Sequence, residues 1–200
     1  MSRREAATLL ALSLAGSVAL AATYTRVDIT LTQSGGSLTV KTDPAAPPLL
    51  GVKTPAMRGN TASVNVAGPP RAWAVKLSPK VPLTLHVNRR GGAATLDLRA
   101  VPLTNLDIIQ EGGQVSVLLP ARSVSITVDQ SQTDVRLTVP KTVGLRVQAP
   151  QFSHGQLIMN GKTMASGTDS DDRYESANYA TAKQRIEVTL TMVDGTLDIR

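Results

Sequence analysis

Few residues in this 200-residue chain could do chemistry, and none is a cysteine. Disulfides, thiolate metal sites and a cysteine nucleophile are therefore excluded. The two histidines are His86, in LTLHV, and His154, in FSHGQ. His86 occupies a strand position typical of a surface imidazole. His154 adjoins Gly155 in a turn-like segment, and a secreted hydrolase whose site is assembled in space from His154 and a nearby serine or carboxylate remains the alternative to a non-enzymatic protein.

The common catalytic and nucleotide-binding motifs are absent from the sequence. It has no G-x-S-x-G elbow, no Walker loop, no G-x-G-x-x-G and no H-E-x-x-H. We therefore expect a protein that is not an enzyme, with no catalytic residues and no cofactor.

Carboxylates concentrate in one segment, at Asp169, Asp171, Asp172 and Glu175. Calcium prefers several hard oxygens supplied by a flexible loop, so a calcium site is conceivable here. The spacing departs from the EF-hand pattern, because Arg173 stands where an oxygen ligand is needed and no glycine follows. The pattern favours a solvated loop, with calcium binding as the alternative and no metal site expected.

The chain is basic, with a formal net charge of +6. Arg89 and Arg90 form the one adjacent basic pair outside the N-terminal segment, and we take them as the candidate contact for an anionic surface. Nucleic acid is not expected as a partner, because single-strand binders stack bases on aromatic rings and aromatic content is only 2%. The same shortage of aromatic residues argues against a sugar-binding module of the aromatic-platform kind.

The N-terminal 21 residues have the pattern of an export signal. MSRRE supplies positive charge, and the apolar run that follows ends in Ala19-Leu20-Ala21, an A-x-A cleavage pattern before Ala22. The run is shorter than the ~20 residues of a membrane span. We expect cleavage, with an uncleaved anchor as the alternative. The mature chain, 22–200, would be one domain without a transmembrane span, located in the periplasm, on the cell surface or outside the cell.

The elements that would position these residues are short strands repeating about every 20 residues. Pro82, Pro102, Pro120 and Pro140 are spaced by 20, 18 and 20 residues. Alternating apolar runs surround them, as in VSVLLPARSVSITV and VRLTVPKTVGLRV, and turn signals such as Gly91-Gly92 and Gly112-Gly113 lie between. A fixed period of this length is typical of a stacked array.

The prolines predict corners of that array. Proline has no N–H to give to a ladder, so it belongs where a strand ends. Alternation then places Val115, Val117 and Leu119 on one face, and Ser116 and Leu118 on the other. The predicted fold is all-β, a β-solenoid or toast-rack-like stack of short strands. An ordinary sandwich of hairpins is the alternative, since Gly-Gly also makes tight hairpin turns.

Three hairpins are predicted at the flanks from turn signals between alternating runs. The first surrounds Gly35-Gly36, the second Asn160-Gly161, and the third, a closing hairpin at the C-terminus, surrounds Asp194-Gly195.

Part of the chain resembles the bacterial toast-rack domain, which also occurs in adhesin-like proteins and in the extracytoplasmic parts of envelope stress-response proteins. The similarity lies in GGAATLDLRAVPLTNLDIIQEGGQVSVLLP, VRLTVPKTVGLRV and the closing YESANYATAKQRIEVTLTMVDGTLDIR. It covers residues 77–200 best. The turn at Gln130 to Asp134 lacks the glycines that the family favours. The resemblance implies a stacked β-domain outside the cytoplasm and transfers no catalytic residues.

Together these features predict an exported, non-enzymatic cell-envelope protein that offers a β-rich binding or scaffolding surface. The role would be adhesin-like or related to envelope stress. The expected partner is an envelope component or anionic polymer, or another protein.

Overall fold

The computed structural model describes residues 24–167 and 172–200, and every regular element in these ranges is a β-strand. The strands are β1 (Arg26–Ser34), β2 (Ser37–Thr42), β3 (Ala56–Arg58), β4 (Thr61–Ala67), β5 (Trp73–Leu77), β6 (Leu83–Arg90), β7 (Ala93–Asp97), β8 (Leu103–Leu118), β9 (Val124–Thr138), β10 (Gly144–Phe152), β11 (Gly155–Met159), β12 (Lys162–Gly167), β13 (Asp172–Glu175), β14 (Arg185–Met192) and β15 (Gly195–Ile199). The all-β prediction is confirmed.

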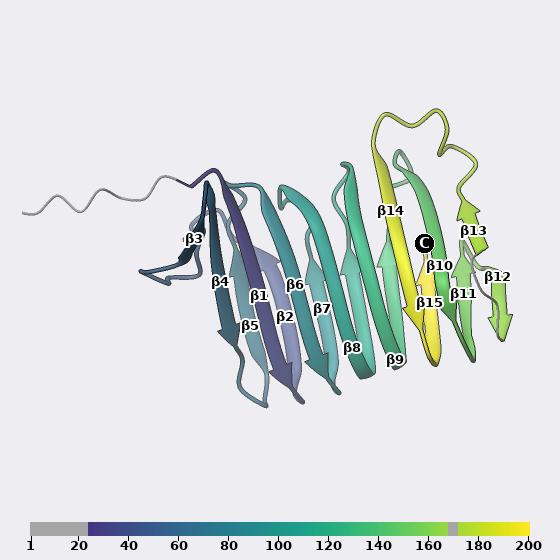
Figure 1. The fold of residues 1–200 in the computed structure, drawn as a ribbon, viewed down its shortest axis with the longest axis horizontal. Helices are drawn as coiled ribbons and strands as arrows, with labels where there is room; N and C mark the ends of the chain where they lie inside the picture. The colour runs from purple at the N-terminus through teal and green to yellow at the C-terminus, as the bar shows by residue number, and fades with distance from the viewer. Residues whose placement is uncertain (1–23, 168–171) are drawn as a thin grey trace, which may run out of the picture.

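The strands form one sheet folded into two layers, which lie one behind the other in Figure 1. Layer A contains, in spatial order, β3, β4, β1, β6, the first half of β8, the first half of β9, β14, β10 and β13. Layer B contains β5, β2, β7, the second halves of β8 and β9, β15, β11 and β12. Because β8 and β9 run through both layers, the sheet is continuous.

Each turn of the stack contributes one strand to each layer, and we call such a pair a rung. The rungs lie in the order β4/β5, β1/β2, β6/β7, β8, β9, β14/β15 and β10/β11, with parallel pairing between neighbouring rungs. Chain order is broken at both ends. The second rung in sequence lies outside the first, and the C-terminal rung is inserted between β9 and the pair β10/β11.

The repeated prolines lie at the corners where the chain passes from layer B to layer A, as predicted. Pro82 and Pro102 directly precede β6 and β8, and Pro120 and Pro140 follow the ends of β8 and β9. Their missing N–H groups fall outside the ladders, but their carbonyls still accept bonds: Val27 N donates to Pro82 O at 2.9 Å and Leu83 N to Pro102 O at 3.0 Å. The corner therefore ends a strand without interrupting the stack.

Glycine turns form the opposite edge of the stack. Gly92 and Gly113 both have positive φ, at 71° and 87°. A Cβ on Gly92 would lie 1.8 Å from Gly36 O, and one on Gly113 would lie 2.0 Å from Gly92 O. The turns of successive rungs therefore stack backbone on backbone, which only glycine permits. In β9 the glycines are missing, and Gln132 adopts the left-handed conformation instead, with φ 52°.

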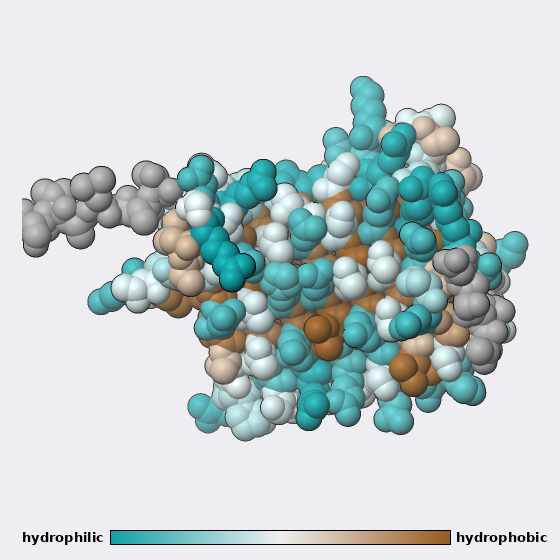
Figure 2. Space-filling model, viewed as in Figure 1, coloured by the Kyte–Doolittle hydropathy of each residue, from teal (hydrophilic) through white to brown (hydrophobic). Residues whose placement is uncertain are grey.

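The interior between the layers is filled by the inward residues of every strand. Val115, Val117 and Leu119 are buried, whereas Ser116 and Leu118 are only half-buried, as the alternation predicts. Valine, leucine and isoleucine dominate this core. Figure 2 shows mainly hydrophilic and neutral residues on the visible face, with isolated hydrophobic ones; the exposed large hydrophobic side chains are Met57, Ile109 and Val193.

Two of the three predicted hairpins are wrong. β14 and β15 pair with β9 and with β10 or β11, not with each other, so the chain does not close in a C-terminal hairpin. β1 and β2 likewise pair with other rungs. The turns at Gly35-Gly36 and Asp194-Gly195 instead carry the chain between the layers. The Asn160-Gly161 hairpin is confirmed, since β11 pairs with β12 in antiparallel fashion.

No helix within residues 24–167 or 172–200 is long and apolar enough to cross a membrane.

Candidate functional site

A groove of about 450 Å³ runs across the outer face of layer B. One row of in-register positions lies along it, from Thr95 through Ser116, Arg136 and Asp198 to Ile158. Its full lining is Ala93, Ala94, Thr95, Gln114, Val115, Ser116, Asp134, Val135, Arg136, Ile158, Thr196 and Asp198. Because outward side chains of parallel rungs align, residues distant in sequence form one continuous polar surface.

The charged centre of the groove is Asp198, which is only 8% exposed. Its Oδ2 accepts hydrogen bonds from Arg136 Nε at 3.2 Å and from Arg200 Nε at 2.9 Å. Burial raises the pKa of this carboxyl, but the bonds from Arg200 and Arg136 outweigh it and hold the pKa below its ordinary value. Two guanidinium groups share the Asp198 carboxylate, and the exposed Asp134, two residues before Arg136 on the same face, adds a second carboxylate to the groove.

The groove offers hydroxyls, an amide, the guanidinium of Arg136 and the carboxylates of Asp134 and Asp198, a mixed set of donors and acceptors that suits a polar ligand. It has no aromatic residue in its lining. Sequence reasoning missed it, because Arg136 and Asp198 are 62 residues apart and meet only through the inserted C-terminal rung. The alternating runs VRLTV and TLDIR predict that Arg136 and Asp198 point outward. They do not predict that the two residues are neighbours.

Arg89 and Arg90, the predicted anion contact, are separated by the sheet. Arg90 is exposed and pairs with Glu111, Nε to Oε2 at 2.9 Å. Arg89 is buried, with 1% exposure, so the prediction that it lies on an anion-binding surface is wrong. The physical reason is that every second side chain of a strand points to the same face, so Arg89 of β6 points inward together with Leu85 and Val87.

Inside the stack, Arg89 belongs to a row of inward residues in register, Gln33, Arg89, Gln110 and Gln130, which we call the polar row. Arg89 Nη2 donates to Gly36 O at 3.0 Å and Nε to Gln33 Oε1 at 3.2 Å. Burial lowers the pKa of its guanidinium. Arg89 therefore binds the carbonyl of Gly36, in the turn between β1 and β2, from within the stack.

His86 lies on the outer face of layer A between two carboxylates. Nε2 is 3.1 Å from Asp28 Oδ1, and Nδ1 is 2.7 Å from Asp107 Oδ2. The three side chains are each about one-third exposed, at 34%, 36% and 36%. This agrees with the expected surface imidazole, since both ring nitrogens have partners on neighbouring strands.

His154 lies at the turn between β10 and β11, exposed and with φ 54°. Its Nδ1 is 2.7 Å from Ser153 Oγ, the residue just before it. A hydrolytic triad also needs a carboxylate on the second ring nitrogen. In the part of the chain that the structure describes, His154 has no carboxylate partner.

Two predicted sites lie outside the described residues in whole or in part. The signal cleavage positions Ala19, Ala21 and Ala22 lie outside them, as do Asp169 and Asp171 of the candidate calcium loop. Of that loop, Asp172 and Glu175 are described: Asp172 Oδ2 accepts a hydrogen bond from Tyr174 Oη at 3.0 Å, and Glu175 pairs with Arg146 at 2.9 Å and with Arg173. Among the described residues, no group of three or more metal-binding side chains is arranged to hold an ion.

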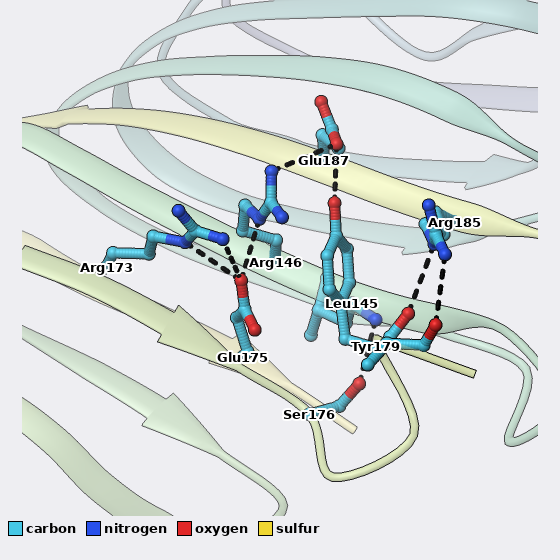
Figure 3. A network of polar contacts seen from close by, with 9 residues as sticks. Leu145, Arg146, Arg173, Glu175, Ser176, Tyr179, Arg185 and Glu187 are labelled. Atoms are coloured by element: carbon cyan, nitrogen blue, oxygen red, sulfur yellow. Dashed lines mark hydrogen bonds and ion pairs between the residues drawn. The ribbon is translucent and has the colours of Figure 1, made fainter. Parts of the chain in front are cut away.

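The densest polar network fastens the segment after β13 onto β10 and β14 (Figure 3). The guanidinium of Arg146 lies 4.1 Å from the centre of the Tyr179 ring, and Tyr179 Oη donates to Glu187 Oε1 at 2.6 Å. The hydrogen bond to Glu187 raises the pKa of the Tyr179 hydroxyl, and burial adds to this. Arg185 donates to the carbonyls of Tyr179 and Ala180, both at 3.1 Å. All these partners belong to the chain itself, so the network holds the fold together.

Comparison with solved structures identifies a similar fold in a putative cell adhesion protein from Clostridium sporogenes. The TM-score is 0.70 at 17% sequence identity, over 88% of this chain and 92% of that chain. The shared feature is the fold. No protein-family model matches the chain, and no curated protein matches it either.

Proposed function

We propose that the protein is exported and acts as a non-enzymatic binding protein of the cell envelope. The outer face of layer B would be its contact surface. The groove carries this proposal, because it aligns polar side chains of several rungs around the ion-paired cluster Arg136–Asp198–Arg200. The signal-like leader supports export, and the fold shared with a putative cell adhesion protein supports an adhesin-like role over one in envelope stress.

The ligand class that the net charge of the chain favours is an anionic envelope polymer or lipid head group. Cleavage before Ala22 would leave 19 basic and 14 acidic residues, a net charge of +5. Long-range attraction would then bring the protein to a negatively charged surface, and the Arg136–Asp198–Arg200 cluster would make the local contact.

The test is retention of the purified chain on isolated cell envelopes at low and high salt. Ser116→Trp fills the groove from its floor, and Thr127→Trp, at an exposed position of layer A, is the matched control. Retention should fall for Ser116→Trp only. It should also weaken in 1 M salt, where the screening length drops from ~10 Å at 0.1 M to ~3 Å. Equal retention of both variants would refute the groove as the contact surface.

A secreted hydrolase remains the second candidate, on the observation that Ser153 Oγ lies 2.7 Å from His154 Nδ1. An esterase and peptidase screen of the chain and of His154→Ala tests it. Hydrolysis that His154→Ala abolishes, without any envelope retention, would establish the hydrolase instead.

A further inference from the structure

The four outer edges of the stack differ in whether a short strand covers them. Three rung strands, β4, β10 and β11, are each covered by a short antiparallel strand, β3, β13 and β12 respectively. The fourth, β5, pairs with β2 and with no other strand of residues 24–167 and 172–200. An uncovered edge presents unpaired backbone N–H and C=O groups, which proteins usually shield.

The β2–β5 ladder shows which backbone groups of β5 lie on its free edge. Asp43 N donates to Leu77 O at 2.9 Å, extending the β2–β5 ladder, so the carbonyl of Leu77 faces β2. Backbone groups alternate sides along a strand. Those of Trp73 and Val75 therefore also face β2, whereas the N–H and C=O of Ala74 and Lys76 point away from it.

A groove of about 470 Å³ lies beside this edge. Asp43, Ala45, Ala46, Pro47 and Leu50 of the segment after β2 form part of its wall, and β5 and Val66 form the rest. That segment is braced by its own bonds, Ala46 N to Asp43 O at 3.0 Å and Leu50 N to Pro47 O at 3.2 Å. It also pairs with β5 through Lys76 Nζ and Asp43 Oδ2 at 3.0 Å. It therefore flanks the strand edge without forming a ladder with it.

The chemistry of the groove identifies what could fill it. Trp73, Val66 and Leu50 are half-buried apolar residues of the lining. On the outward side, Lys76 is directly opposite Lys41 in register, and both are exposed. Asp43 pairs with Lys76 and Asp97 lies near Lys41, but the Lys76 side chain stays 70% exposed, so its ammonium group is accessible to a further carboxylate. An added strand with apolar inward residues and an acidic outward residue would complement both faces.

We propose that the edge of β5 binds an extended segment of another protein by strand addition. The segment carries apolar residues at alternate positions and an acidic residue beside Lys76. Main-chain bonds to Ala74 and Lys76 supply affinity, and the apolar wall and the lysine pair supply selectivity. This interaction is independent of the layer B groove, which lies on a different set of strands.

The test uses the full chain and a fluorescein-labelled Val-Glu-Val-Glu-Val peptide, with Val-Lys-Val-Lys-Val as the charge control. Ala74→Pro removes one of the N–H groups that point away from β2, and proline is tolerated on a strand edge. Ala74→Val keeps the N–H and is the matched control. Fluorescence polarisation should show that Ala74→Pro raises Kd about tenfold, as expected for one lost backbone hydrogen bond, while Ala74→Val leaves it unchanged. Lys76→Glu should reverse the preference between the two peptides.

Equal affinity of Ala74→Pro and Ala74→Val, or no binding of either peptide to a folded chain, would overturn the proposal. Circular dichroism of each variant establishes that it is folded. A concentration-dependent dimer that Ala74→Pro abolishes would also overturn it, because a second copy would then occupy the edge. Slower hydrogen exchange at the amides of Ala74 and Lys76 on peptide addition would support it directly.

Discussion

Two neighbouring rows run through the interior of layer A, and they differ in polarity although both point inward. The first row is Leu31, Val87, Ile108 and Val128, all buried and in register. The second, two residues further along each strand, is the polar row, Gln33, Arg89, Gln110 and Gln130, which is equally buried.

The difference arises from what each row faces. The polar row lies beneath the turns between the layers, whose carbonyls need donors: Gln33 Nε2 donates to Arg71 O at 2.8 Å, Gln110 Nε2 to Gly112 O at 2.5 Å, and Gln130 Nε2 to Thr133 O at 3.2 Å. A buried carbonyl without a donor costs free energy. Alternation therefore decides which residues are inside, and the local backbone decides whether the interior is polar.

The largest effect is expected where a charge enters the apolar part of the interior. Val117→Asp places a carboxylate at a position with 0% exposure, and should lower the free energy of unfolding by several kcal/mol, to the point of unfolding the chain. Thr189→Asp, at an exposed position of layer A opposite the uncharged Thr127 and Gln148, is the control and should change little. Thermal denaturation of both variants tests this, and an unchanged melting temperature for Val117→Asp would contradict the assigned register.

The next largest effect distinguishes charge from polarity within the polar row. Arg89→Glu would bury an anion against Gly36 O and Gln33 Oε1, and should cost about 3–5 kcal/mol, as other broken buried charge contacts do. Arg89→Gln repeats the residue found at the two following rungs and should cost much less. Urea denaturation of the pair gives the comparison. Similar stabilities for both would show that Arg89 does not act as a donor to the turn.

These rows also show how far the sequence predicts the molecule. The proline spacing and the alternation predicted the rungs, the corners and the inward face of Val117. The same alternation also predicts that Arg89 is buried, because LTLHVNRR places Arg89 on the same face of the strand as the apolar residues Leu83, Leu85 and Val87. Arg89 and Arg90 were assigned to one surface because both are charged, but the alternation along the strand places Arg89 inside and Arg90 outside.

The order of rungs was not predictable in the same way. Every rung has similar alternation, and parallel neighbours need no special turn, so the pattern does not specify which rung is adjacent to which. The two-residue signal at Asp194-Gly195 fits a hairpin and a passage between layers equally well. For this reason the contact of Arg136 with Asp198, and with it the groove, could not be derived from the sequence.

A smaller effect concerns the partly buried carboxylate of the groove. The pKa of Asp198 is lowered in the folded chain, so the stabilisation is present above its unfolded value of ~3.9 and is lost as pH falls through the folded pKa. Asp198→Asn should therefore be less stable than the parent chain at pH 7, and this gap should narrow on acidification. Denaturant titrations from pH 7 downward measure it, with the exposed Asp134→Asn as control. A gap that stays constant with pH would contradict the assignment.

The smallest effect is expected at Arg90, next to the buried Arg89 but on the solvent side. Its guanidinium is 79% exposed and paired with a Glu111 side chain that is 62% exposed. Exposed ion pairs contribute about 0–1 kcal/mol, so Arg90→Glu should leave the free energy of unfolding within that range. Double-mutant analysis with Glu111→Gln isolates the pair, and its coupling should shrink in 1 M salt. A loss as large as that of Arg89→Glu would mean that the two arginines are not on opposite sides of the sheet. Because Arg90→Glu keeps the fold, it can also be used in the envelope assay, where a double Arg89/Arg90 variant would report unfolding instead of lost charge.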